Sequence, residues 1–124
     1  MTRRRRAVQL PLPLEVPPLP AAVRADLRTE VVPGWTGRAA CASRSVDPDW
    51  WHAPAGDELQ EVARGVCQSC PVRRSCLAHA LATGEPEGLW GGADEGERVW
   101  MRLALAEGTR VAAVLDPTSR TAAA

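Results

Sequence analysis

Apolar residues recur at helical spacing in the middle of this chain. A helix over residues 58–66 would place four apolar side chains on one face: Leu59, Val62, Ala63 and Val66. Asp57 precedes this segment and is a suitable N-cap residue, because its carboxylate can accept a hydrogen bond from a free N–H of the first turn. A short helix is also predicted over residues 21–29, from the sequence AAVRADLRT.

Two further helices are predicted downstream. Pro71 suits the first turn of a helix, where its missing N–H is not needed, so we expect a helix over residues 72–83 that ends at Gly84. Asp94 begins a capping box, DEGE, for a last helix over residues 95–108. No stretch alternates apolar and polar residues for long. The predicted fold is therefore all-α, a small helical bundle with long loops.

The domain organisation follows from length and proline content. The chain has 124 residues, enough for one domain. Residues 7–20 contain five prolines, which favour extended chain over helix. We expect residues 1–33 to form a disordered extension rich in Arg and Pro, 34–108 to fold, and 109–124 to be a flexible tail. A folded part of roughly 70–80 residues is near the size limit for an apolar core alone, so the cysteines are candidates for a staple.

The expected location of the protein decides which cysteine chemistry is favoured. Prolines and Glu15 interrupt every apolar run near the N-terminus, so we expect no secretory signal. No segment approaches the roughly 18 apolar residues of a membrane span. We therefore expect a cytoplasmic protein, although its net charge of zero identifies no partner. Structural disulfides are disfavoured in a reducing cytosol, which points the cysteines toward metal or redox chemistry.

The chain contains four cysteines, three of them close together. Cys67, Cys70 and Cys76 form the pattern C-x2-C-x5-C, and a proline follows the second. A C-x2-C pair lets two thiolates converge on one metal centre. Cys76 would follow in the adjoining helix, and Cys41 would complete the coordination from a distant loop.

Several chemistries fit these cysteines. Structural zinc accepts four thiolates, or three with His79, but zinc sites usually pair two short motifs. A thioredoxin-like dithiol would use Cys67 and Cys70, but the βαβ unit expected beside it is absent. A disulfide framework suits the compartment poorly. An iron–sulfur cluster held by four cysteines tolerates irregular spacing and a proline after a ligand, so it fits best. The spacing alone leaves zinc open.

The tryptophans form a second candidate feature. The chain has five Trp and no Phe or Tyr. Four of the five fall in predicted loops or turns: Trp35, Trp50, Trp51 and Trp90. They either fill a thin core around the cysteines or anchor a partner, because loop-borne Trp buries much area at little cost in rotamer entropy. The glycines around Trp90 suit a turn that needs positive φ or close backbone approach: Gly88, Gly91 and Gly92.

Together these motifs resemble the WhiB-like proteins of actinobacteria. The residues that carry the resemblance are Cys41, the C-x2-C-P-V of 67–72, Cys76-Leu77 and the G-L-W-G-G of 88–92. The similarity runs from about residue 35 to 103. It implies a helical fold around one 4Fe–4S cluster per chain, held by the four cysteines, and a role in transcription. It also implies binding to region 4 of the primary sigma factor within RNA polymerase holoenzyme, and reaction of the cluster with O2 or nitric oxide.

The same resemblance assigns residues to the sigma-factor surface: Trp35, Trp50, Trp51, Gly88, Trp90, Gly91 and Gly92. Two positions depart from the family pattern, since the pair 50–51 is usually Phe or Tyr and Leu89 is usually Val or Ile. The resemblance also raises an enzymatic alternative, a protein disulfide reductase that uses Cys67 and Cys70 in the metal-free form. We expect a regulator rather than an enzyme.

DNA contact is expected to be weak or indirect. Many WhiB-like proteins carry a basic segment after the last helix, but residues 104–124 hold two arginines and two acids. The remaining candidates for phosphate contact are arginines in two places: Arg3, Arg4, Arg5, Arg6, Arg98 and Arg102. The last two could instead pair with Asp94 and other local acids. The two histidines, His52 and His79, are expected in packing or solvent-facing positions.

Overall fold

The computed structural model describes residues 17–116, which form five α-helices and three short 3-10 helices. Their order is α2 (Ala21–Thr29), η1 (Trp35–Arg38), η2 (Ala40–Ala42), η3 (Pro48–His52), α3 (Glu58–Gln68), α4 (Arg73–Thr83), α5 (Glu95–Ala106) and α6 (Val111–Leu115). Within this part of the chain there is no β-strand, only an isolated bridge between Trp90 and Ala93. The prediction of a small all-α fold with long loops is confirmed.

Local capping chemistry sets the helix ends largely as predicted. Asp57 caps α3, accepting a hydrogen bond from the N–H of Leu59 at 2.8 Å. Asp94 and Glu97 form a complete capping box at the start of α5. Gly84 ends α4 in the left-handed region, with φ of 73°. These interactions satisfy N–H and C=O groups that helix ends leave free.

Pro71 departs from its predicted place. It precedes α4 instead of lying in its first turn, and Val72 is the N-cap residue. The N–H of Arg73 donates to the carbonyl of Cys70 at 3.3 Å, which closes a turn with Pro71 at its second position. The chain therefore bends between Cys70 and α4 before the helix begins.

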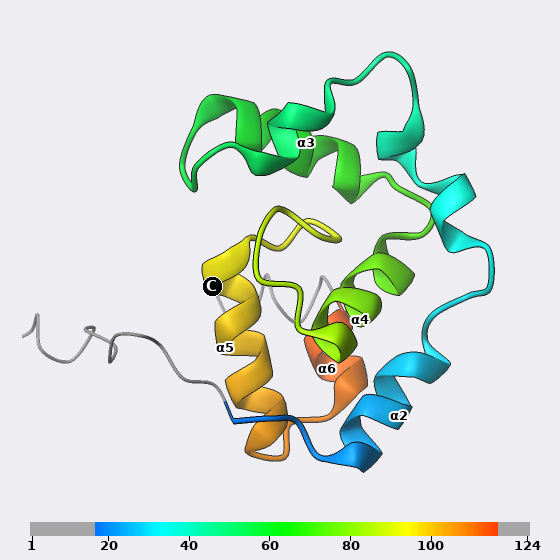
Figure 1. Ribbon diagram of the computed structural model, residues 1–124, viewed down its shortest axis with the longest axis vertical. Coiled ribbons are helices and arrows are strands. Elements are labelled where there is room, and N and C mark those ends of the chain that lie inside the picture. The colour runs from blue at the N-terminus through cyan, green and yellow to red at the C-terminus, as the bar shows by residue number, and fades with distance from the viewer. Residues whose placement is uncertain (1–16, 117–124) are drawn as a thin grey trace, which may run out of the picture.

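Most of the apolar core lies between α2, α4, α5 and α6, which pack together at one end of the molecule (Figure 1). We call this cluster the main core. Its buried members are Leu19, Leu27, Leu77, Ala78, Leu81, Ala93, Leu105, Val114 and Leu115. The C-terminal half of the chain thus supplies most of the core, and α2 closes it from the N-terminal side.

The main core corrects the predicted boundaries of the folded part. Residues 17–33 were expected in a disordered extension and 109–116 in a flexible tail, yet Leu27 and Leu115 are both fully buried. The amphipathic α2 and the five-residue α6 cover apolar faces of α4 and α5 that would otherwise meet water. Residues 1–16 and 117–124 lie outside the described residues, and with them Arg3 to Arg6.

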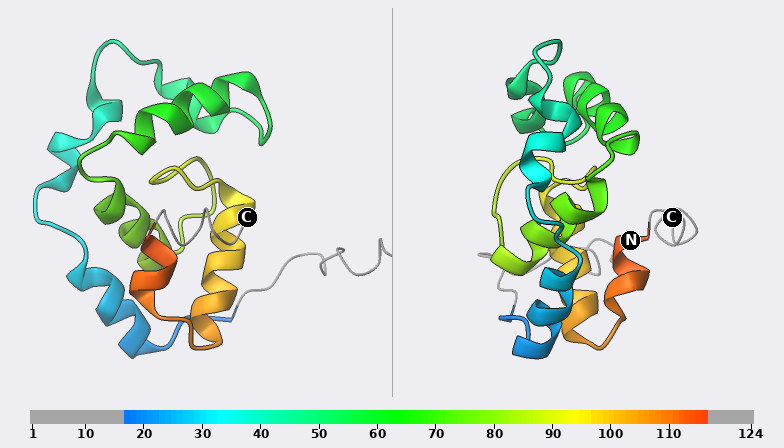
Figure 2. Two further views of the ribbon diagram at one scale, coloured as in Figure 1. Left: turned by 180° about the vertical axis from the view of Figure 1, so that it is seen from behind. Right: turned by 90° about the vertical axis from the view of Figure 1, so that its right-hand side faces the viewer.

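A second, smaller apolar cluster lies around α3 and η3 at the other end of the molecule (Figures 1 and 2). We call it the cysteine-side cluster. Its buried members are Trp51, Ala63, Cys67 and Leu89, and three residues pack against it while partly exposed: Val46, Trp50 and Val66. In these views the chain from α4 to α5 runs between α3 and the helices of the main core.

Only part of the apolar face of α3 is buried. Ala63 is buried and Val66 packs against the cysteine-side cluster, whereas Leu59 and Val62 are each 48% exposed. Gln60 and Cys67 face inward instead. Cys67 and Ala63 pack against Trp51 and Leu89, and this contact sets which side of the helix is buried.

Arg64 ties α3 to the rest of the molecule. Its guanidinium donates to the carbonyl of Gly92 at 2.6 Å and to the carboxylate of Glu97 at 2.8 Å. A further contact reaches the carboxylate of Asp94 at 3.4 Å. The capping box of α5 therefore also anchors the helix that carries Cys67. None of the helices between residues 17 and 116 combines the length and apolar character needed to cross a membrane.

Candidate metal centre

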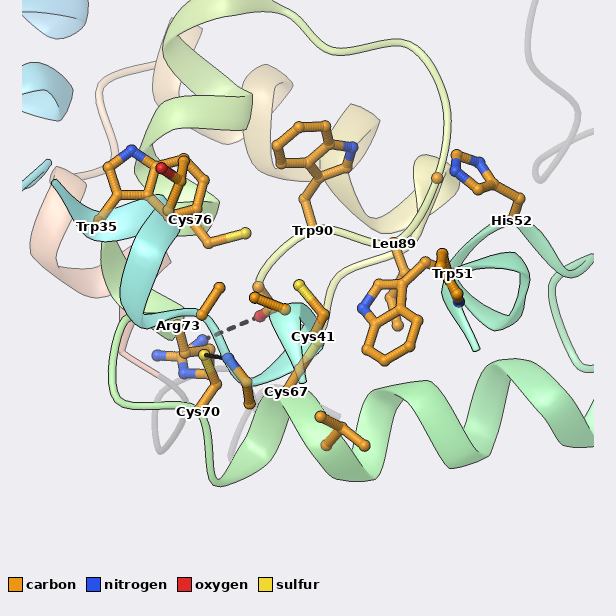
Figure 3. A pocket seen from close by; sticks show the side chains of 18 residues that line it. Trp35, Cys41, Trp51, His52, Cys67, Cys70, Arg73, Cys76, Leu89 and Trp90 are labelled. Carbon is orange, nitrogen blue, oxygen red and sulfur yellow. Dashed lines mark hydrogen bonds between the residues drawn. The ribbon is translucent and has the colours of Figure 1, made fainter. Parts of the chain in front are cut away.

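All four cysteines border one cavity of about 320 Å³. They come from different elements: Cys41 from η2, Cys67 from α3, Cys76 from α4, and Cys70 from the turn between the last two helices. Figure 3 shows their side chains around this space, with tryptophans at its border. The structure thus brings together the residues that the sequence selected, across 35 positions of chain.

The four thiols differ in exposure. Cys67 is buried at 7% exposure, Cys70 and Cys76 are half-buried, and Cys41 is exposed. All four are free thiols, and no disulfide joins any of them. Cys41 is therefore the most exposed of the four residues.

Burial shifts the thiols toward their neutral form. Desolvation is the main cause that raises the pKa of Cys41 and Cys67, and it raises the pKa of Cys76 to about 12. Charges on the neighbouring cysteines raise these pKa values further. Thiolates at this density need a positive group among them, because otherwise they repel one another in a poorly solvated space.

Hydrogen-bond donors already face three of the sulfurs. The N–H of Ala40 donates to Sγ of Cys70 at 3.3 Å. The backbone amide of Gly91 faces Cys76 and that of Gly92 faces Cys67, and each opposes the rise in the pKa of its thiol. Donors that face sulfur stabilise thiolates and tune a metal centre bound to them.

The glycine-rich turn, residues 88–92, lies directly against α4. A Cβ on Gly91 would stand 2.7 Å from the carbonyl oxygen of Arg73 and 2.7 Å from Cβ of Leu77, so only glycine fits. Its φ of 57° adds strain for any other residue. This close approach brings the amides of the turn to the sulfurs.

Arg98 organises the turn from beneath and is not a surface residue. It is 3% exposed and donates to the carbonyls of Gly88 at 2.6 Å, Ala93 at 2.8 Å and Glu85 at 3.1 Å. This burial argues against the predicted contact of Arg98 with DNA, while the alternative prediction, an interaction with local acids, agrees with the attraction of its charge to Glu95, Asp94 and Glu85. The turn leaves carbonyl groups facing inward, and a guanidinium can serve several of them at once. Arg102 is half-buried, and its guanidinium lies over Gly84.

Arg73 is a residue of the site that the sequence analysis missed. It lines the cavity, and its guanidinium donates to the carbonyls of Gly91 at 3.3 Å and Leu115 at 2.8 Å. It thereby joins the glycine-rich turn to α6. The only signal in the sequence is its position beside the C-x2-C motif, which does not identify distant carbonyl partners.

The predicted partner-binding tryptophans fall into two groups. Trp35, Trp50 and Trp90 are half-buried, so part of each indole remains at the surface. Trp51 is only 8% exposed and belongs to the cysteine-side cluster, where its side chain interacts with Cys67. Its assignment to a partner surface is therefore corrected to an interior role. The rings of Trp50 and Trp51 stack, with centroids 6.4 Å apart.

The site does not resemble a prearranged single-ion site. Within residues 17–116 no group of three or more His, Cys, Asp or Glu side chains is close enough to hold one metal ion. His79 is absent from the residues that line the cavity, so it does not join the cysteines there. The four thiols border a wider space instead.

Comparisons with known proteins agree on one family. The family model described as "Transcription factor WhiB" matches residues 35–101, which include all four cysteines and the glycine-rich turn. The chain is 40% identical over 83 residues to "Transcriptional regulator WhiB2" of Mycobacterium tuberculosis, covering 67% of this chain and 90% of that protein. It is 41% identical over 70 residues to "Transcriptional regulator WhiD" of Streptomyces coelicolor, covering 52% and 62%. It is 40% identical over 82 residues to "Redox-responsive transcriptional regulator WhiB3" of Mycolicibacterium smegmatis, covering 61% and 80%.

Proposed function

This chain belongs to the WhiB family of transcription factors, and on that premise we propose that its cysteines hold one 4Fe–4S cluster beside a surface for the primary sigma factor. As a WhiB-family transcriptional regulator, it acts with the transcription machinery or DNA. The proposal adds the cofactor, the partner and the signal. The single observation that carries it is the meeting of all four cysteines at one cavity.

The residues around this cavity fit such a cluster. Raised pKa values mean that the thiols would be neutral without a cationic group, while three of the sulfurs already face N–H donors. The cluster, when bound, supplies positive iron for the thiolates and a centre that can change redox state. Cys41, Cys67, Cys70 and Cys76 are its ligands in this proposal. The absence of His79 from the cavity lining disfavours a zinc site of three cysteines and one histidine.

The burial of Cys67 disfavours a disulfide reductase. An attacking thiol in such an enzyme has a lowered pKa, because its thiolate is the nucleophile. Burial instead raises the pKa of Cys67, the first cysteine of the C-x2-C pair. The names of the relatives describe transcriptional regulators, which is consistent with a non-enzymatic role.

The partner surface is assigned to the exposed parts of Trp35, Trp50 and Trp90, together with the glycine-rich turn that carries Trp90 and packs against α4. Trp35 and Trp90 border the cavity, and Trp50 packs against the cysteine-side cluster. Half-buried indoles suit an interface, since each can bury much apolar area with little loss of rotamer entropy. Region 4 of the primary sigma factor is the partner. Because Gly91 and Gly92 face two of the cluster ligands, loss of the cluster would release the turn and with it the surface.

Promoter DNA is engaged mainly through the sigma factor in this proposal. Arg98 is buried and bonded to backbone carbonyls, so it offers no free guanidinium for phosphates, whereas the half-buried Arg102 stays a candidate for weak contact. The arginine run at positions 3–6 remains a candidate for weak, salt-dependent attraction. The signal is O2 or nitric oxide, which would reach the cavity from the side of the exposed Cys41.

Anaerobic co-purification with region 4 of the primary sigma factor tests this function. We expect a coloured protein with about four iron and four sulfide per chain that retains the sigma domain, as a 4Fe–4S centre requires. Trp90→Ala should keep its iron and lose the partner. Trp100→Ala is the matched control, because Trp100 is 58% exposed on α5 and away from the cavity lining.

Three results separate the parts of the proposal. A colourless protein with one zinc per chain would exclude the cluster. A coloured protein that does not retain the sigma domain would exclude the partner while leaving the cluster intact. Exposure of the complex to O2 or nitric oxide should bleach it and release the sigma domain together, and bleaching without release would exclude the proposed signalling.

A further inference from the structure

An aromatic row crosses the rim of the cavity and contains a histidine. The imidazole of His79 lies between two indoles, with its centroid 5.5 Å from the ring of Trp35 and 5.7 Å from the ring of Trp90. The three rings come from η1, α4 and the glycine-rich turn. Between residues 17 and 116 no direct ring contact joins the two tryptophans, so the histidine is the ring that connects them.

The place of His79 on α4 relates the row to the cysteines. His79 follows Cys76 by three residues, so the two side chains neighbour each other along one face of the helix. Cys76 lines the cavity, and His79 does not. The helix thus presents Cys76 toward the cavity and, about one turn later, the ring of His79 toward the indoles at the rim of the cavity.

The ring contacts of His79 are with tryptophans. The residue is half-buried, and its imidazole contacts the rings of Trp35 and Trp90. Both indoles are side chains of the proposed sigma-factor surface.

We propose that His79 is a positioning residue that holds Trp35 and Trp90 in one row and so prearranges the partner surface. The expected effect on affinity rests on the proposed sigma-factor binding, whereas the arrangement of the rings does not. Trp90 has one further constraint, because its indole N–H donates to the carbonyl of Glu87 at 2.8 Å. Without the imidazole, both indoles lose a ring contact and gain rotational freedom.

Prearrangement has a measurable effect on affinity. Immobilising a flexible side chain at an interface costs binding free energy, and prior ordering removes that cost. With His79→Ala, both indoles must be ordered during binding. We expect the Kd for sigma region 4 to rise roughly tenfold, from ordering one or two large side chains. His79→Phe keeps a flat ring at the same position and should stay within about threefold of the original Kd.

The experiment uses the full chain with its iron, sigma region 4 as the probe, and Trp100→Ala as the matched control. Iron per chain should be equal in all variants. A Kd for His79→Ala equal to the original would overturn the proposal. So would a loss of iron that accounts for the lost affinity, since His79 would then support the cofactor, or a His79→Phe variant as weak as His79→Ala.

A second measurement does not depend on the sigma factor. In the free protein, the indole N–H resonances of Trp35 and Trp90 should shift or broaden in His79→Ala, while that of Trp100 stays in place. If neither the original protein nor Trp90→Ala bound sigma region 4, the proposed partner would fall, and these resonances would still decide the role of His79. Unchanged resonances for both rim tryptophans would contradict it.

Discussion

The main core and the cysteine-side cluster are built differently. The main core has nine buried residues, seven of them from four helices, and five leucines there are almost completely buried: Leu27, Leu77, Leu81, Leu105 and Leu115. The cysteine-side cluster has four buried residues, and one of them is Cys67. Burying a leucine stabilises a fold by roughly 1.5–3 kcal/mol, so apolar packing serves the first region far better than the second.

Polar and sulfur contacts take the place of apolar area in the second region. Arg64 joins α3 to Gly92 and to the capping box of α5, and the N–H of Leu89 donates to the carbonyl of Trp51 at 2.9 Å. The cysteines are divided in the same way, because Cys41 and Cys67 lie on the side of η2 and α3 whereas Cys76 lies on α4. An iron–sulfur cluster held by all four cysteines would therefore join the two regions. The comparison teaches that apolar packing holds one region together, whereas the other has little of it and would depend on the proposed iron–sulfur cluster.

The largest effect is expected from Cys41→Ala. Because this cysteine is the only proposed ligand from η2, its loss should abolish retention of the cluster, and iron per chain should fall from about four to near zero. Circular dichroism should still report the helices of the main core. Ser69→Ala is the matched control, since Ser69 is exposed and lies between two ligand cysteines. Full iron content in Cys41→Ala would remove Cys41 from the ligand set.

Leu81→Ala tests the other side of the comparison. Leu81 is 1% exposed in the main core, so its truncation should lower the free energy of unfolding by about 2–5 kcal/mol. The protein that remains folded should keep its iron, because Leu81 does not line the cavity. Chemical denaturation together with iron analysis measures both. A variant that lost iron without losing stability would contradict the division into a main core that supplies stability and a cysteine side that holds the iron.

Gly91→Ala should affect the contact between the regions. Its new Cβ would meet backbone and Cβ atoms at 2.7 Å, and the positive φ adds strain. We expect a loss of about 1–4 kcal/mol in stability, with weaker retention of iron. Gly65→Ala is the control, because its Cβ would meet open space within α3 and should stabilise the helix by about 0.5–1 kcal/mol. Equal behaviour of the two variants would contradict the close approach of turn and helix.

The smallest expected effect concerns pH in the metal-free protein. Burial raises the pKa of Cys67 and Cys76 above the ordinary value of 9.0, to about 12 for the second. A raised pKa in the folded state gives stability that is complete below pH 9.0 and is lost as the pH rises toward about 12. The free energy of unfolding should therefore fall across this window. A Cys67→Ser, Cys76→Ser double variant should show less of that fall, and an identical pH profile would contradict buried, neutral thiols.

The sequence predicted features that depend on neighbouring residues. Asp57, Gly84 and Asp94 end or begin helices through contacts within a few positions, so their roles could be recognised from local pattern alone. The helix over Ala21–Thr29 was predicted for the same reason. The choice of four cysteines rested on spacing and on resemblance, and their meeting at one cavity agrees with it.

Features that depend on distant contacts could not be predicted in this way. Periodicity placed Leu59 and Val62 on a helical face but contained no information about which face Trp51 would cover. Arg98 resembled a surface residue because the sequence shows its charge but not the carbonyl groups of the glycine-rich turn to which it donates. The packing of α6 against the main core depends on helices many residues away.

Hydrogen exchange of the full chain, before and after removal of its iron, tests the central claim most directly. With the cluster bound, amides in α3, α4 and α5 should all be protected. After removal, protection in residues 40–70 should fall by about a hundredfold or more, as local opening approaches the free energy of a weakly packed segment, while α4 and α5 keep theirs. Equal protection of both regions without iron, or equal loss in both, would contradict the division between a packed core and a cofactor-dependent region.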